Sequence, residues 1–319
     1  MRPFRFLAEP GGDVADGPAL AAAARRAEAM GYSAVVYADH LVLPFGFVPL
    51  LTWAAAATER IRVMPFVANN DLRHPAILAQ DLASLDVLSG GRVEVAMGAG
   101  WNRPEYDAIG IPFDPVGTRV GRLAEAIAVV KGSLGDEPFS FSGEHYTITD
   151  YDGLPKPVQR PRPPLFIGGG GKRVLTLAGR EADTVSLAPR TLTASSGEAV
   201  RSDPRSITIA ATEEKIGWIR DAAGDRFADI ELNVYPTGTA PEVTDHPRKA
   251  AADLLDRIRA RTGVEVDVDE YLASPNVFIG SIDGLVAKIT ELRERLGISS
   301  IMVGDLDTLA PVVERLAGT

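Results

Sequence analysis

Short apolar runs alternate with amphipathic stretches along the chain. Eight of these runs are continuously apolar or β-branched, without strict alternation of polar and apolar residues. Parallel strands that are buried on both faces have this pattern. We predict strands at Phe4–Leu7, Ser33–Ala38, Ile61–Val67, Val93–Met97, Leu165–Ile167, Thr184–Leu187, Ile230–Tyr235 and Ser300–Val303.

The stretches between these runs have the periodicity of helices. Apolar residues recur every three or four positions, as in the stripe formed by Leu285, Ile289, Leu292 and Leu296. Eight strands that alternate with helices predict an α/β protein with a (β/α)8 TIM barrel, a fold that usually takes about 250 residues. A doubly wound open sheet fits the same alternation and is the alternative.

The length of the chain leaves room for insertions in this barrel. The chain has 319 residues, so roughly 70 residues exceed the usual barrel length. We expect a single TIM-barrel domain over 1–319, with insertions near 137–163, 189–206 and 263–276, where Pro, Gly, Ser and acidic residues are frequent.

Composition and charge exclude several classes of protein. The chain has no cysteine, which removes disulfides, thiolate catalysis and cysteine metal sites. Its net charge of -10 argues against a nucleic-acid-binding surface. The uncharged stretch 41–57 approaches the length of a membrane span, but Pro44, Gly46 and Pro49 interrupt it. We interpret it as a buried loop that leads into a core helix, and we expect a cytoplasmic protein that needs neither a membrane nor a metal ion.

Polar and glycine residues follow the predicted strands at their carboxyl ends, where TIM barrels place their active sites. The positions after the first five strands are occupied by Glu9, Asp39 with His40, Asn69, Gly100 with Trp101, and a run of four glycines. These residues are therefore expected around one mouth of the barrel.

The glycine run joins the fifth strand to a helix that starts near Lys172. Bare backbone N–H groups at a helix N-terminus bind anions, and glycine lets a phosphate approach closely. Two cationic residues follow the run. We predict a phosphate site there, with a flexible turn as the alternative interpretation; the run consists of Gly168, Gly169, Gly170 and Gly171.

Asp39 and His40 are the candidate acid–base pair. A histidine exchanges protons near neutral pH, and a strand-end position aims it at a ligand. In the alternative reading, Asp39 caps the following turn and His40 only packs. Trp101 is interpreted as a wall of the pocket, with a core plug as its alternative, and His74 before Pro75 is expected to open a helix.

The same residues resemble the bacterial luciferase-like oxidoreductase family. Its motifs are matched by YADH (37–40), by RHPAILAQDLASLDVLSGGRVEVAMGAGWNRPEY (73–106), by KPVQRPRPPLFIGGGGKRVLTLAGREADTVSL (156–187) and by VFIGSIDGLVAKITELRERLGISSIMV (277–303). The resemblance covers most of 1–188 and 277–303 and fades across 189–275.

The resemblance implies a barrel that binds FMN or the deazaflavin coenzyme F420 at the carboxyl ends of the strands. The aspartate–histidine pair resembles the deazaflavin-dependent branch, in which it sits beside the reactive edge of the ring. The glycine run corresponds to the loop that holds the cofactor phosphate, and a non-proline cis peptide is expected within 66–68. The implied cofactor contacts are Asp39, Phe66, Val67, Ala68, Asn69, Gly100, Trp101, Gly168, Gly169, Gly170 and Gly171.

One departure from the family changes the expected substrate. Deazaflavin-dependent sugar-phosphate dehydrogenases carry a glutamate where this chain has Trp101. This argues against glucose 6-phosphate and for a less polar organic substrate. The first hypothesis is therefore an F420-dependent oxidoreductase in which His40 protonates or polarises the reacting group, Asp39 fixes its tautomer, and Trp101 with the loop 41–48 keeps the pocket dry.

Two other functions stay open at this level. One is an FMN-dependent monooxygenase that uses reduced flavin and oxygen, and the other is a non-catalytic cofactor-binding barrel. The resemblance also implies a reductase that supplies reduced cofactor and a homodimeric assembly. The substrate and the direction of hydride transfer do not follow from a fold.

Overall fold

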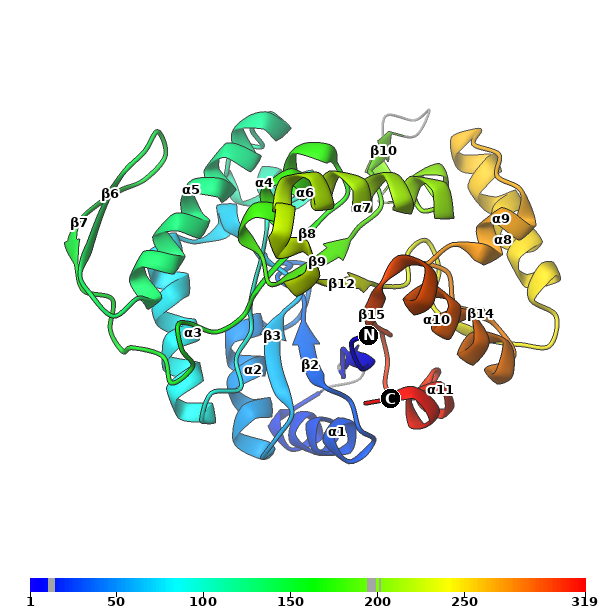
Figure 1. Cartoon of the computed structure of the whole chain (residues 1–319), viewed down its shortest axis with the longest axis horizontal. Coiled ribbons are helices and arrows are strands. Elements are labelled where there is room, and N and C mark those ends of the chain that lie inside the picture. Colours follow the sequence, from blue (N-terminus) through cyan, green and yellow to red (C-terminus); the bar gives the residue numbers. More distant parts are fainter. Residues whose placement is uncertain (11–14, 194–198, 201) are drawn as a thin grey trace.

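The structure is a computed structural model that describes residues 1–10, 15–193, 199–200 and 202–319. Nine parallel strand segments form one sheet, which winds into a barrel (Figure 1). In chain order they are β1 (Arg5–Ala8), β2 (Ala34–Tyr37), β3 (Arg62–Pro65), β4 (Ala68–Asn69), β5 (Val95–Gly98), β8 (Leu165–Gly169), β9 (Thr184–Leu187), β12 (Glu231–Val234) and β15 (Ile298–Met302).

The barrel is closed by one strand that is interrupted in its middle. β3 pairs with β2, whereas β4 pairs with β5, and only Phe66 and Val67 separate the two segments. β3 and β4 therefore count as one barrel strand, and the sheet has eight. The predicted (β/α)8 barrel is confirmed, and the open-sheet alternative is wrong.

Helices surround the barrel, as Figure 1 shows. Several begin where a side chain accepts a hydrogen bond from a free backbone N–H, as predicted for His74 at the start of α3. The surrounding helices are α1 (Gly17–Ala29), α2 (Phe47–Ala57), α3 (Pro75–Ser89), α5 (Val116–Leu134), α6 (Lys172–Glu181), α7 (Ile209–Ala223), α10 (Ile282–Leu296) and α11 (Ala310–Leu316).

The hydrophobic core has two layers. The larger layer lies between the strands and the helices, and the smaller one fills the inside of the barrel. Both faces of each strand are therefore buried, which explains the continuously apolar runs in the sequence. The inner layer consists of Leu7, Ala34, Val36, Met64, Ala96 and Phe166, with Phe66, Val67 and Met302 packed against it.

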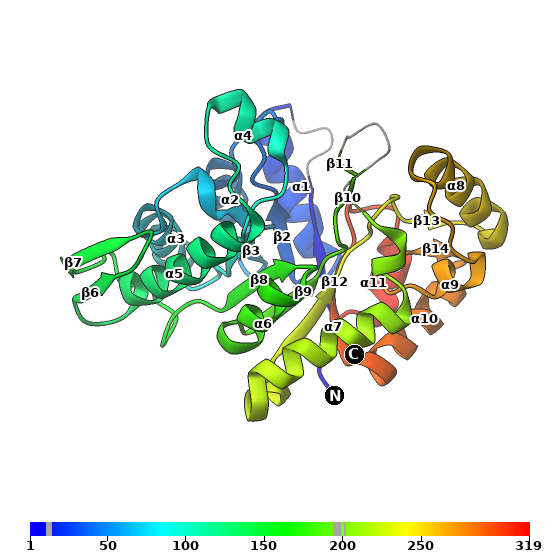
Figure 2. The ribbon, with the colours of Figure 1, turned by 90° about the horizontal axis from the view of Figure 1, so that it is seen from above.

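Additional elements follow several strands. A hairpin of β6 (Phe139–Ser142) and β7 (Thr147–Tyr151) lies on one flank, and a subdomain with its own small core lies on the opposite flank (Figures 1 and 2). The remaining elements are α4 (Arg103–Ile109), β10 (Leu192–Thr193), β11 (Ala199–Val200), β13 (Glu242–Val243), α8 (Pro247–Thr262), α9 (Val268–Ala273), β14 (Ile279–Gly280) and the 3-10 turns η1 (Asn70–Leu72), η2 (Pro204–Ser206) and η3 (Gly224–Asp229).

The structure confirms the core helix expected in the uncharged stretch 41–57, but not the buried loop. Its second part is α2, whose Phe47 and Leu51 are buried in the core. The loop before it is exposed, with Val42 75% accessible, so the expectation of a buried loop is wrong. Within the described ranges, no helix is long and apolar enough to cross a membrane.

A network of charges lies at the amino ends of the strands. Arg5 of β1 forms ion pairs with Glu94 and with Glu231, and the Arg62 Nε atom lies 2.6 Å from a Glu94 carboxylate oxygen. Burial raises the pKa of Glu231, although the Arg5 guanidinium opposes this shift. The network joins the starts of four strands at the end of the barrel opposite the mouth.

Candidate active site

The mouth of the barrel is organised around the break between β3 and β4. The Phe66–Val67 peptide bond is cis, within the range in which a non-proline cis bond was expected. The Val67 side chain faces the ends of two other strands. A Cβ atom built on Gly98 would lie 2.7 Å from Val67 Cγ2, and one on Gly168 would lie 3.7 Å from Val67 Cγ1. Glycine at the end of β5 therefore makes room for Val67.

Aromatic rings line the same centre. The Phe66 ring lies 5.5 Å from the Phe166 ring and 5.4 Å, edge-on, from the ring of Tyr235 at the end of β12. On the other side of the mouth, the rings of His40 and Trp101 meet edge to face at 5.6 Å. Trp101 is half-buried, which agrees with a pocket wall rather than a core plug.

His40 has a buried carboxylate as its partner. Its Nδ1 atom lies 3.0 and 2.9 Å from the two carboxylate oxygens of Glu105, on α4. Glu105 is only 3% exposed, whereas the His40 side chain stays 21% exposed. The structure thus joins the end of β2 to the helix that follows β5.

Asp39 does not contact the His40 ring through its carboxylate. Its Oδ2 atom accepts hydrogen bonds from the backbone N–H of Asn69 and from Arg73 Nη1, at 2.9 and 3.1 Å, and its Oδ1 atom accepts one from Arg73 Nη2 at 3.4 Å. The expectation that Asp39 fixes the tautomer of His40 is therefore wrong, because the neighbouring chain segment takes both oxygens. Burial raises the pKa of Asp39, although Arg73 and the Asn69 N–H oppose this shift.

A second network fixes the loop after β5. The Tyr106 hydroxyl lies 3.0 Å from Asn69 Oδ1 and 3.0 Å from an Asp71 oxygen, and burial raises the pKa of Tyr106. Gly100 has a φ of +72°, and a Cβ atom on it would overlap the Tyr106 hydroxyl. Glycine is therefore required at this position by both backbone conformation and space.

The glycine run is not uniform. A Cβ atom on Gly170 would collide with the carbonyl oxygens of Ala188 and Pro189, and one on Gly169 would collide with Val174. A Cβ atom on Gly171 would meet nothing within 4 Å. Gly171 also precedes the first turn of α6, which no side chain caps. Of the four glycines, Gly171 is therefore the one that borders open space.

The start of α6 carries two positive charges beside this space. Lys172 and Arg173 are exposed, and neither forms an ion pair with an acidic side chain of the described residues. A hollow of about 400 Å³ adjoins them between α5 and α6; it is lined by Val120, Gly121, Ala124, Lys172, Arg173, Thr176 and Leu177. An anion bound at the glycine run would meet uncompensated positive charge.

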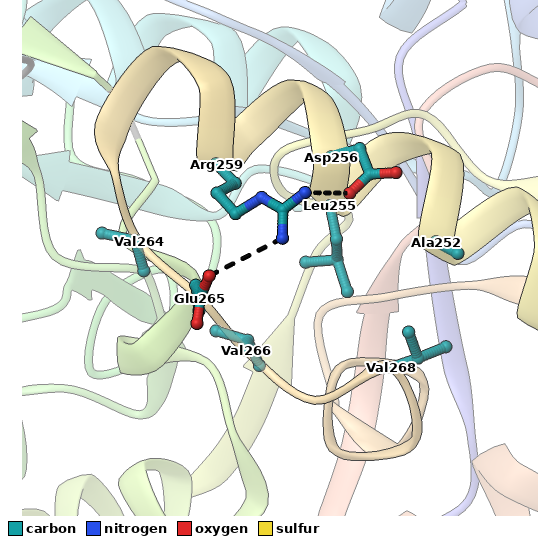
Figure 3. A pocket seen from close by; sticks show the side chains of 8 residues that line it. All are labelled: Ala252, Leu255, Asp256, Arg259, Val264, Glu265, Val266 and Val268. Carbon is teal, nitrogen blue, oxygen red and sulfur yellow. Dashed lines mark hydrogen bonds and ion pairs between the residues drawn. The ribbon is translucent and has the colours of Figure 1, made fainter.

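Another hollow lies away from the mouth, against α8 on the outer flank (Figure 3). It measures about 250 Å³, and Arg259 spans its rim with ion pairs to Asp256 at 3.0 Å and Glu265 at 3.6 Å. It contains none of the predicted site residues. In the part of the chain that the structure describes, no three His, Asp or Glu side chains come together to hold a metal ion.

The structure brings most of the predicted residues to one mouth and adds others. Glu105, Tyr106 and Arg73 were not predicted. Glu105 follows Trp101 by four residues. This closeness in the sequence was the available signal, but α4 begins only at Arg103, after Trp101, and the sequence does not say which strand end the carboxylate reaches.

Comparison with known proteins gives a consistent set of relatives. Residues 3–207 match the sequence profile of the family described as "Luciferase-like monooxygenase". An FMNH(2)-dependent dimethylsulfone monooxygenase of Pseudomonas putida is 38% identical over 128 residues, which are 40% of this chain and 35% of that protein. An F420-dependent glucose-6-phosphate dehydrogenase of Kineococcus radiotolerans is 34% identical over 176 residues, or 51% and 50% of the two chains.

The match thus spans a third to a half of the length of these two relatives. Over the whole chain the likeness is structural. The coenzyme F420-dependent tetrahydromethanopterin reductase of Methanopyrus kandleri superimposes with a TM-score of 0.75 at 22% identity, covering 99% of this chain and 98% of that one. At this identity the superposition shows a shared fold.

Proposed function

The chain belongs to the luciferase-like monooxygenase family, and from this premise we propose that it is a coenzyme F420-dependent oxidoreductase that moves a hydride between the deazaflavin and a small organic substrate. One observation carries the proposal most directly. A partly exposed histidine, His40, is held by the buried carboxylate of Glu105 at the barrel mouth, beside an aromatic wall. Such a ring can exchange a proton with a bound substrate.

The residues present fit a phosphate-bearing cofactor. The uncapped first turn of α6, the open space at Gly171, and Lys172 and Arg173, which have no acidic partner among the described residues, suit a phosphate group. The Val67 side chain packs into the room left by the glycines at the ends of β5 and β8, and in this proposal the cofactor ring lies against it. In this proposal the predicted contacts at Phe66–Ala68, Asn69, Gly100, Trp101 and the glycine run hold the cofactor.

The chain's own residues supply position and a proton. When bound, the deazaflavin accepts or donates the hydride. His40 takes or gives the matching proton at its Nε2 atom, so the reduced substrate carries one hydride and one proton more than the oxidised substrate. Asp39, tied to Arg73 and to the backbone of Asn69, holds the ends of β2 and β4 together. Trp101 and the rings around Phe66 favour an apolar substrate over a sugar phosphate.

A second candidate is an FMN-dependent monooxygenase that uses reduced flavin and oxygen. The dimethylsulfone monooxygenase relative, which has the higher identity over a shorter stretch, supports it. The glucose-6-phosphate dehydrogenase relative, which matches over more of this chain, supports F420. The monooxygenase, and the F420 enzyme when it reduces its substrate, would need a reductase that supplies reduced cofactor. We expect residues 1–319 to act as one catalytic domain in a homodimer.

Anaerobic titration with F420 and with FMN tests the proposal. We expect the dissociation constant for F420 to be at least about tenfold lower, a difference of about 1.4 kcal/mol. A screen of ketones, secondary alcohols and imines, followed by the absorbance of oxidised F420, should then give turnover. Tighter binding of FMN, with oxygen uptake that depends on reduced FMN and substrate, would favour the monooxygenase. Binding of either cofactor without turnover across both screens would favour a non-catalytic barrel.

A further inference from the structure

We propose that Glu105 is the positioning residue of His40, and that it keeps the Nδ1 atom protonated so that Nε2 is the atom presented to the substrate. The inference rests on the proposed function for its catalytic meaning, but not for its geometry. It replaces the role that the sequence assigned to Asp39.

The geometry at Nδ1 leaves one arrangement of the proton. Both carboxylate oxygens of Glu105 lie within 3.0 Å of this nitrogen. An ionised carboxylate only accepts hydrogen bonds, so the nitrogen that faces it must carry the hydrogen. Because a neutral imidazole has one N–H, the hydrogen at Nδ1 leaves Nε2 as an acceptor. A proton that then binds at Nε2 gives an imidazolium whose charge the carboxylate stabilises.

Burial makes this preference strong. The Glu105 side chain is 1% exposed, so water gives it little solvation, and an unpaired charge there would be costly. Among the described residues, His40 is the side chain recorded as its hydrogen-bond partner. The carboxylate and the ring therefore depend on each other, in the same way as the acid and the histidine of a catalytic triad.

The rest of the mouth holds Glu105 in place. The next residue, Tyr106, is fully buried, and its hydroxyl bonds to Asn69 at the end of β4 and to Asp71 in the turn after it. The backbone N–H of Glu105 donates to the carbonyl of Asn102. Thus α4 cannot turn about its axis without breaking the Tyr106 contacts. The edge-to-face contact between the Trp101 and His40 rings is a second restraint on the orientation of the imidazole.

The other acid near His40 is already committed. The Asp39 carboxylate accepts from Asn69 N and Arg73, and the Arg73 guanidinium also lies 4.5 Å from the centre of the Phe47 ring. Asp39 therefore has no free oxygen aimed at Nδ1. Its charge acts on His40 only through space, which does not select one ring nitrogen over the other.

The tautomer of His40 can be measured directly in the free protein. Two-bond ¹H–¹⁵N correlation spectra distinguish Nδ1–H from Nε2–H rings, and with four histidines in the chain a His40→Asn variant identifies the signal. We expect the Nδ1–H form in the wild type. In Glu105→Gln, whose amide both donates and accepts, we expect the Nε2–H form to appear. Asp107→Asn is the control, because it removes an exposed acid from the same helix.

A second variant distinguishes the loss of the positioning role from misfolding of the protein. Glu105→Asp keeps the charge on a shorter side chain and should keep most of the Nδ1–H form, even if Glu105→Gln folds poorly. F420 affinity should change less than about threefold in all of them, because His40 does not hold the phosphate. A wild-type Nε2–H signal, or an unchanged Nδ1–H signal in folded Glu105→Gln, would overturn the inference.

These outcomes are distinct from failure of the proposed function. If the tautomer responds to Glu105 but F420 does not bind, the positioning role stands and the F420 assignment falls. If F420 binds and turns over while the tautomer ignores Glu105, the F420 assignment stands and the positioning role falls.

Discussion

Both ends of the barrel contain a buried glutamate that joins separate strands, but the partners of the two glutamates differ. Glu94, at the amino ends, is 1% exposed and pairs with the guanidinium groups of Arg5 and Arg62. Glu105, at the mouth, is 3% exposed and pairs with the imidazole of His40. Burial is the same in both places, so burial alone does not identify the active site.

The chemistry of the partner makes the difference. A guanidinium stays protonated at every pH a protein experiences, so the pairs at Glu94 can only hold strands together. An imidazole exchanges protons near neutral pH, and its second nitrogen is free for another group. The mouth also keeps Lys172 and Arg173 without acidic partners among the described residues. We therefore expect changes at the amino ends to affect stability, and changes at the mouth to affect catalysis and binding.

The largest expected effect is at His40. His40→Ala should lower turnover by about 10²–10⁴-fold, the usual contribution of a general acid or base. F420 affinity should change little, whereas thermal stability should fall, because the buried Glu105 carboxylate loses its hydrogen-bond partner. The measurement is turnover and F420 titration on the same preparation, with the exposed His246→Ala as the control. Abolished F420 binding would instead make His40 a cofactor clamp.

The matching change at the opposite end is Glu94→Ala. It removes the buried carboxylate that Arg5 and Arg62 share, although Arg5 keeps Glu231, and we expect a loss of about 3 kcal/mol in the free energy of unfolding. Urea unfolding measures this loss, and Glu59→Ala, an exposed acid in a loop, should show almost none. The fraction of Glu94→Ala protein that is folded should bind F420 as the wild type does. Weaker F420 binding by that folded fraction would contradict the expectation that the amino ends of the strands affect stability alone.

The anion site is best tested at Gly171. The crowding at Gly170 means that a bulky residue there would disturb the 188–189 backbone, whereas Gly171 has open space and a φ of -102°, which any residue can adopt. Gly171→Val should therefore fold normally and fill the space beside the first turn of α6. We expect F420 affinity to fall by about 1–3 kcal/mol, the value of a hydrogen bond to a charged group.

The control for this variant is Gly217→Val on α7, where an added Cβ also meets nothing within 4 Å. Equal affinities of the two variants for F420, and for inorganic phosphate as a competitor, would remove the glycine run from the cofactor site.

The smallest expected effect is on stability at Asp39. Burial raises its pKa in the folded protein above the ordinary value of about 3.9, so the folded state binds more protons than the unfolded state as the pH rises from about 4. The ionised carboxylate thus costs stability at neutral pH. We expect Asp39→Asn to change the free energy of unfolding at pH 7 by less than about 1 kcal/mol, or to raise it.

The sign of this effect is checked by urea unfolding at several pH values. The stability of Asp39→Asn relative to the wild type should improve as the pH rises from about 4 to 7. A strong loss at pH 7 would show that the Arg73 pair outweighs burial and that Asp39 resembles Glu94 more than a site residue.

Much of the fold follows from local order in the chain. The eight apolar runs coincide with barrel strands because both faces of those strands are buried, and Gly90 and Gly297 end helices in the left-handed conformation that favours glycine. The elements outside the barrel were harder to predict from the sequence. α8, with 16 residues, has few apolar positions because it buries only one narrow face against a small subdomain core.

The candidate site, like the fold, could be predicted from the sequence only in part. Strand ends could be located from the residues that follow each apolar run, and this placed Asp39, His40, Trp101 and the glycines around one mouth. The hydrogen-bond partners of these side chains could not be predicted in this way. Asp39 is adjacent to His40 in the chain, yet its carboxylate points to Arg73, while Glu105 reaches the ring from 65 residues away.

The order of residues therefore determined the barrel, the mouth and the list of polar groups at it, because periodicity and turn chemistry act over a few neighbouring residues. The partners at the mouth depended on how the closed barrel brings the ends of β2, β4 and β5 together. A hydrogen bond depends on distance and direction in space, and the closing of the sheet sets both. For this reason Glu105, an ordinary helix residue in the sequence, became the partner of His40 only in the folded chain.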